Sequence, residues 1–125
     1  MRIIALLLVA IVMLSQVAFL VLEMFLWTDE ISYSIFETTP EFAKASKVLA
    51  ANQGLHKGFL AAGLLWGLLS GRRDVKAFFL CCVIVAGVYG GLTANMSILY
   101  VQAAPALAAL LAVLATPTPR VRHRL

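Results

Sequence analysis

The feature that most constrains this fold is a run of apolar residues long enough to cross a lipid bilayer. The run extends from Ile3 to Trp27 and contains one charged side chain, Glu23. A helix needs about 20 predominantly apolar residues to span the hydrocarbon core. A signal peptide would also begin this way, but the run ends in bulky residues rather than a small-residue cleavage site. We therefore expect this run to be a retained membrane span.

Three further apolar segments follow, separated by short polar stretches. The four predicted spans cover residues 3–27, 47–70, 75–94 and 99–115. Thr39 and Pro40 are typical of a helix start, and we expect one helix from Pro40 to Ser70 whose first turns stand outside the hydrocarbon core. The polar residues 28–37 are expected to form a loop. The sequence thus predicts a single all-α domain, residues 1–125, folded as a four-transmembrane-helix bundle.

The placement of charge predicts how the bundle is oriented. The chain is 62% hydrophobic and 13% charged, whereas a soluble domain carries about a quarter charged residues. Basic residues precede the first span, follow the second in the Arg72-Arg73 turn, and follow the fourth in the tail. The loop after the first span is net acidic. By the positive-inside rule, both termini face the cytoplasm and the acidic loop faces outward.

Several classes of function lack their sequence signatures. The net charge is +4, but the basic residues form no groove with interleaved aromatic side chains, as nucleic-acid binding requires. The adjacent Cys81 and Cys82 point about 100° apart on a helix, and we interpret them as packing residues. Metal-binding cysteine spacings, phosphate-binding glycine loops and haem-attachment motifs do not occur. We therefore expect no nucleic-acid partner, no metal and no cofactor.

Polar side chains inside the predicted spans are the best candidates for a functional site, because each is costly in lipid. Counted from the cytoplasmic side at about 1.5 Å per residue, Glu23 lies about 30 Å up and Lys57 about 20 Å. Side chains lean toward the start of their own helix, so these two lean toward each other, and an ion pair is predicted. The candidate ligand-binding residues, all in the outer half, are Glu23, Asn52, Gln53, His56, Lys57, Tyr89 and Gln102.

Small residues recur every four positions along the second span. Such rows let helices approach closely in lipid, and we interpret them as packing surfaces. The two rows are Gly54, Gly58, Ala62 and Gly63, Gly67, Gly71.

An ordered set of short motifs resembles the bacterial membrane family known as domain of unknown function 1304. The motifs are Leu22-Glu23-Met24-Phe25-Leu26-Trp27, Thr39-Pro40-Glu41-Phe42, Ala51-Asn52-Gln53-Gly54, Gly58-Phe59-Leu60-Ala61, Gly87-Val88-Tyr89-Gly90 and a late Gln102. The resemblance implies a four-helix, multi-pass protein of the bacterial inner membrane, and it implies no activity. The chain departs from the family pattern in having Ser15-Gln16 where members often carry Glu-His, and His56-Lys57 where they often carry Tyr-Asn.

Three functional hypotheses remain open at this stage. The first is a binding module with an outward-facing polar pocket for a small amphipathic or anionic ligand. The second is a small proton-coupled transporter, dimeric, in which Glu23 exchanges a proton. The third is a structural or accessory membrane subunit. No reaction follows from the residues, so the sequence favours a protein that is not an enzyme, and catalytic residues stay unassigned. The expected partners are the lipid bilayer, a small-molecule ligand and a second copy of the chain.

Overall fold

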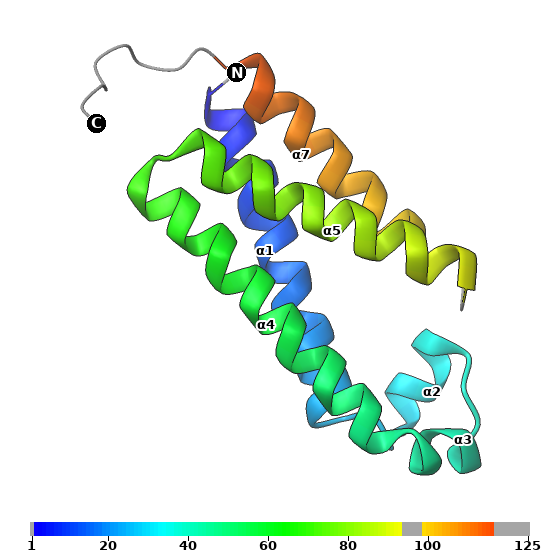
Figure 1. Ribbon diagram of the computed structural model, residues 1–125. Coiled ribbons are helices and arrows are strands. Elements are labelled where there is room, and N and C mark those ends of the chain that lie inside the picture. Colours follow the sequence, from blue (N-terminus) through cyan, green and yellow to red (C-terminus); the bar gives the residue numbers. More distant parts are fainter. Residues whose placement is uncertain (1, 94–98, 117–125) are drawn as a thin grey trace.

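Helices account for nearly all of the computed structural model, which describes residues 2–93 and 99–116 (Figure 1). No strand occurs among these residues, and the predicted all-α class is confirmed. In chain order the elements are α1 (Arg2–Met24), α2 (Glu30–Phe36), α3 (Pro40–Ala45), α4 (Lys47–Ser70), α5 (Arg73–Thr93), the π-helical turn η1 (Leu99–Ala103) and α7 (Ala104–Ala115).

The four long helices form a ring in which sequence neighbours run antiparallel (Figure 1). Helix α1 packs against α4 and α7, while α5 packs against α4, α7 and η1. The order around the ring is therefore α1, α4, α5, α7. Arg2, at the start of α1, and Ala115, at the end of α7, lie at the same end of the bundle.

An apolar core fills the half of the bundle near these two ends. It consists of small and medium side chains from all four long helices: Ala5, Val9, Val12, Leu64, Leu80, Val83, Ala106, Ala109, Ala112 and Val113. Glycines bring α4 close to α5, because a Cβ atom on Gly67 would stand 3.1 Å from the backbone nitrogen of Lys76. Gly63 on α4 faces the ring of Phe79 on α5. Gly63 and Gly67 of the second row therefore serve packing, as the sequence predicted. Gly71 does not, because no atom lies within 4 Å of a Cβ atom added there.

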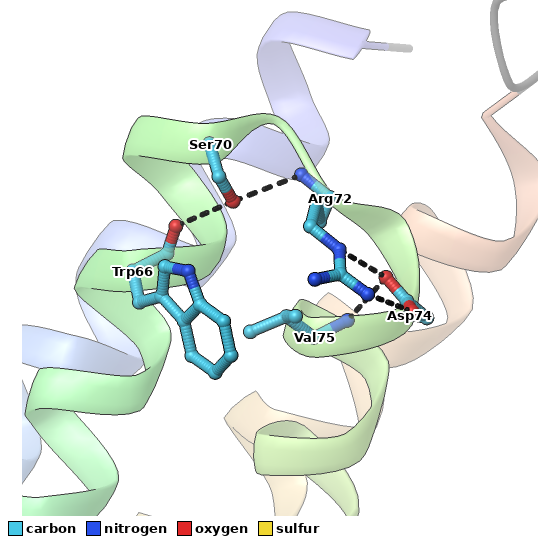
Figure 2. A network of polar contacts seen from close by, with 5 residues as sticks. All are labelled: Trp66, Ser70, Arg72, Asp74 and Val75. Atoms are coloured by element: carbon cyan, nitrogen blue, oxygen red, sulfur yellow. Dashed lines mark hydrogen bonds and ion pairs between the residues drawn. The ribbon is translucent and has the colours of Figure 1, made fainter. Parts of the chain in front are cut away.

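A compact polar network closes the turn between α4 and α5 (Figure 2). Gly71 ends α4 in the left-handed conformation with φ of 71°, which glycine adopts without a Cβ clash. The Arg72 guanidinium donates to the Asp74 carboxylate at 2.7 Å and lies over the Trp66 ring at 5.8 Å. The Ser70 hydroxyl donates to the Trp66 carbonyl oxygen. The hydrogen bond from Arg72 holds the pKa of Asp74 below its usual range.

The segment between the first two spans differs from the sequence prediction. Helix α1 ends at Met24 rather than continuing to Trp27, and helix α2 occupies most of the expected loop. Asp29 starts α2 by accepting a hydrogen bond from the Ile31 backbone nitrogen. Asp29 is a typical N-cap residue, a local sequence signal of a helix start that the prediction of a loop did not take into account.

The expected single helix from Pro40 to Ser70 is interrupted at Ser46. The predicted start is confirmed, because the Thr39 hydroxyl accepts a hydrogen bond from the Phe42 backbone nitrogen. At Ser46 the backbone leaves helical geometry, with φ of −101° and ψ of 10°. The Ser46 hydroxyl accepts a hydrogen bond from the Trp27 indole at 3.1 Å and donates to the Phe42 carbonyl at 2.7 Å. The Ser46 side chain therefore links the junction of α3 and α4 to Trp27.

The π-helical turn before α7 has a simple cause in the sequence. Proline lacks an amide hydrogen, and its ring clashes with the carbonyl four residues earlier in a regular α-helix. Pro105 would oppose the carbonyl of Val101, and the wider η1 turn occupies the residues just before it. Turns of this kind recur at functional positions, and this one carries Gln102.

Among the described helices, α1 is the one that is both long and apolar enough to cross a membrane, and Tyr100–Ala115 is a shorter apolar helix. The helical bundle is thus established, while the four membrane crossings and the cytoplasmic placement of both ends stay predictions. Residue 94, the predicted end of the third span, lies outside the described residues.

Candidate functional site

The site is built on the buried stripe of α1. Buried positions on this helix recur every three or four residues, at Ala5, Val9, Val12, Gln16, Phe19 and Glu23. This spacing keeps one face of a helix against its neighbours. The first three positions belong to the apolar core, whereas the C-terminal part of the same stripe carries an amide, an aromatic ring and a carboxylate. Along this stripe, polar groups therefore enter the interior only in the C-terminal half of α1.

A buried ion pair joins α1 to α4. The Lys57 Nζ atom lies 2.6 Å from the Glu23 Oε2 atom, and the two side chains are 16% and 4% exposed. Gly54 allows the helices to meet at this level, because a Cβ atom there would stand 3.2 Å from both the Leu20 carbonyl oxygen and the Glu23 Cβ atom. The predicted meeting of Glu23 and Lys57 is thus present in the structure.

The Phe19 ring lies against this pair and begins a chain of three aromatic rings. The Lys57 ammonium stands 5.1 Å from the centroid of the Phe19 ring, within the range of a cation–π interaction. Phe36, from α2, lies 5.9 Å from the Phe19 ring and 5.1 Å from the Trp27 ring. Because the sequence prediction made residues 28–37 a loop, it did not place Phe36 between the Phe19 and Trp27 rings.

The hydrogen bonding of the pair is incomplete. The buried Glu23 Oε1 atom has no hydrogen-bond partner among the described residues. An ionised carboxylate accepts on both oxygens, and a lysine ammonium carries three donors. One Lys57 donor goes to Glu23 Oε2. The pair can therefore accept a hydrogen bond from a donor on a bound molecule at Glu23 and offer a donor at Lys57.

The structure does not gather the other predicted site residues around this pair. Asn52, Gln53 and His56 are exposed on α4, and the His56 ring packs 5.8 Å from the Phe59 ring on the same helix. Tyr89 on α5 is 70% exposed.

Gln102 is buried in the η1 turn, where its Cβ atom would lie 3.0 Å from a Cβ atom on Gly87 of α5. Of the seven candidates, Glu23 and Lys57 meet each other directly. Within residues 2–93 and 99–116, no cluster of three or more His, Cys, Asp and Glu side chains could hold a metal ion.

Two buried polar residues in the described part of the chain, Gln16 on α1 and Ser32 on α2, were not among the predicted site residues. Gln16 is fully buried on the α1 stripe, and neither its amide oxygen nor its amide nitrogen has a hydrogen-bond partner. Its depth in the first span was readable from the sequence, but its orientation was not. The register of the stripe, with Val12 and Phe19 as buried neighbours, provides that orientation.

Comparison with known proteins identifies a family and no activity. The family described as "Protein of unknown function (DUF1304)" matches residues 10–114, which include every residue of the site. No curated protein and no solved structure matches the chain.

Proposed function

The chain belongs to the DUF1304 family, and we propose that it is a multi-pass membrane protein that binds a small amphipathic molecule near the outer end of a four-helix bundle. The observation that carries this proposal is the buried Glu23–Lys57 pair, with one carboxylate oxygen left without a partner. The proposed binding residues are Glu23 and Lys57, with Phe19 as the apolar wall.

Support for the membrane comes from the outward faces of the long helices. Each of them exposes large apolar side chains that water would not favour. Examples from the four helices are Leu7, Leu14, Leu49, Leu69, Phe78, Val85, Leu107 and Leu111. At about 1.5 Å per residue, α1, α4 and α5 are each about 31 to 36 Å long, enough for the hydrocarbon core of about 30 Å.

Support for the orientation comes from the turn between α4 and α5. This turn presents Arg72 and Arg73 at the end of the bundle where α1 begins. Arg73 also donates to the Leu114 carbonyl oxygen at the last turn of α7, at 2.6 Å. A basic end is expected to face the cytoplasm, which places the Glu23–Lys57 pair toward the outside.

Support for a ligand comes from the energetics of a buried ion pair. Desolvation of two charges offsets most of their attraction, so stability alone is a weak reason for such a pair. An unpartnered buried carboxylate oxygen adds a further cost, which a hydrogen-bond donor on a ligand would remove. The Phe19 ring offers an apolar surface beside the charges, and Phe36 packs against that ring. A molecule with a polar head and a short apolar chain suits both features.

Thermal unfolding in lipid nanodiscs tests this proposal. The parent protein is titrated with octanamide, octanol, octanoate and octylamine, which share one chain length and differ in the polar head. We expect at least one probe to raise the unfolding temperature in a saturable manner. Lys57→Met is expected to abolish that rise, whereas Lys47→Met, the same change at an exposed position on α4, is expected to preserve it. An equal response from the parent and Lys57→Met would contradict the proposal.

The same preparation separates the two alternatives. A proton-coupled transporter would move its solute into proteoliposomes under a pH gradient, and Glu23→Gln would stop the movement. An accessory subunit would unfold more easily in the Glu23 and Lys57 variants, without a response to any probe in the parent.

A further inference from the structure

Gln16 occupies an unusual position for a primary amide. It is fully buried on the stripe that α1 turns toward the bundle interior, and both its Nε2 and Oε1 atoms lack partners. Nε2 carries two donors and Oε1 accepts on two lone pairs. Leaving a buried polar group unsatisfied carries a full desolvation cost, so native proteins seldom keep one without a role.

Gln16 also marks the boundary between two kinds of interior. From the inner end outward, the buried positions of α1 are apolar up to Val12, and the next one is Gln16. Counted back along α7 and into η1, the buried alanines are 112, 109, 106 and 103, and the next buried residue is Gln102. On α1, and on α7 with η1, a series of apolar buried residues is therefore followed by one buried amide side chain.

Gln16 and Glu23 lie on the same face of α1. They are seven residues apart, which corresponds to about 10 Å along a helix. Phe19 lies between them on the stripe. An octyl chain has a comparable length, so one linear molecule with a polar group at each end can meet the ion pair with one group and the Gln16 amide with the other, across the Phe19 ring.

Resting on the function proposed above, we infer that the binding site extends inward from Glu23 and Lys57 to Gln16, and that its ligand presents an uncharged carboxamide-like group to the Gln16 amide. A carboxamide offers a donor and an acceptor side by side, so it satisfies Nε2 and Oε1 together. A carboxylate offers acceptors alone and would leave Oε1 unpaired. An alkylammonium offers donors alone and would leave Nε2 unpaired. Either charge would also be stranded in an apolar core.

Binding of octanamide to Gln16→Met in nanodiscs tests this inference. Methionine has the length and flexibility of glutamine without its hydrogen-bonding groups, so the unliganded variant is expected to unfold at a higher temperature than the parent. The variant is expected to bind octanamide about tenfold more weakly or worse, because two hydrogen bonds are lost. Its affinity for octanoate and octylamine is expected to be unchanged. Gln53→Met, at an exposed position on α4, is the matched control.

A second measurement is made on the parent protein, and the Gln16→Met variant serves only to assign the Gln16 signal. The chain has three glutamines, at positions 16, 53 and 102, so the side-chain amide signals of ¹⁵N-glutamine-labelled protein form three pairs. Saturation with octanamide is expected to shift the pair that is missing from the Gln16→Met spectrum, whereas octanoate leaves it in place. A Gln16 signal that no octanamide concentration moves would overturn the inference, as would a Gln16→Met variant that binds octanamide as tightly as the parent.

The failure of this inference differs from the failure of the proposed function. If Lys57→Met abolishes binding of a probe while Gln16→Met changes nothing, the outer site stands and its inward extension is refuted. If Lys57→Met changes no probe response, the proposed function itself is refuted.

Discussion

Removing Lys57 is expected to destabilise the protein much more than neutralising Glu23. Lys57→Met leaves a carboxylate that is 4% exposed without its cation, and breaking a buried pair in this way costs about 3–5 kcal/mol. Glu23→Gln leaves an ammonium that is 16% exposed and still lies against the Phe19 ring. The new amide oxygen can accept from Lys57, so the cost is expected to be about 1–2 kcal/mol.

A double-mutant cycle measures the two effects and their coupling. The free energy of unfolding is obtained for the parent, both single variants and the double variant in mixed micelles titrated with sodium dodecyl sulfate. The double variant is expected to be more stable than Lys57→Met alone, because it contains no orphaned charge. This requires a coupling energy larger than the cost of Glu23→Gln, about 2–3 kcal/mol. The control Lys47→Met, on the exposed first turn of α4, is expected to change stability by about 0.5 kcal/mol or less.

Two results would refute this reasoning. Equal effects of Lys57→Met and Glu23→Gln would show that the difference in burial between the two side chains does not affect the free energy of unfolding. Additive effects in the double variant would show that the two groups do not interact in the membrane-like environment.

Two further predictions concern the α4–α5 hairpin. Gly67→Val is expected to lower stability by about 1–3 kcal/mol, because its side chain would force α4 away from the Lys76 backbone. Ala62→Val, at an exposed position on α4, is the control, and an equal loss in both variants would contradict the packing role. Asp74→Asn is expected to lower the unfolding temperature slightly at neutral pH. The bond from Arg72 lowers the folded-state pKa of Asp74, so its contribution is present above the unfolded pKa of about 3.9 and is lost as pH falls through the lower folded value. The parent and Asp74→Asn should converge in acid, and a difference that persists there would contradict this assignment.

The ion pair was predictable from the sequence because it depends on two simple quantities. Depth along a helix follows from residue number, and the lean of a side chain follows from the helix direction. Glu23 and Lys57 satisfy both conditions, and the structure joins them. The helix start at Thr39 was predictable for a similar reason, since its capping bond is local.

The side of α4 that packs against the other helices was not predictable, because the spacing of residues alone does not identify the packed side of a helix. Gln53 and Lys57 are four residues apart, yet Gln53 is exposed. Gly54 faces Met24 and Glu23 of α1, so the packed side of α4 runs through Ala50 and Gly54 rather than through Gln53. At the break in the helix, Ser46 likewise contacts a partner, Trp27, that is distant in the sequence.

Labelling of an introduced cysteine from outside the membrane tests the account most directly. In a background without Cys81 and Cys82, a membrane-impermeant maleimide is added to sealed right-side-out vesicles carrying Lys57→Cys. We predict labelling without permeabilisation, as for Val48→Cys at the outer end of α4, whereas Leu69→Cys at its inner end is labelled only after permeabilisation; both control positions are well exposed. Labelling of Lys57→Cys only after the vesicles are opened, as for Leu69→Cys, would contradict an outward-facing site.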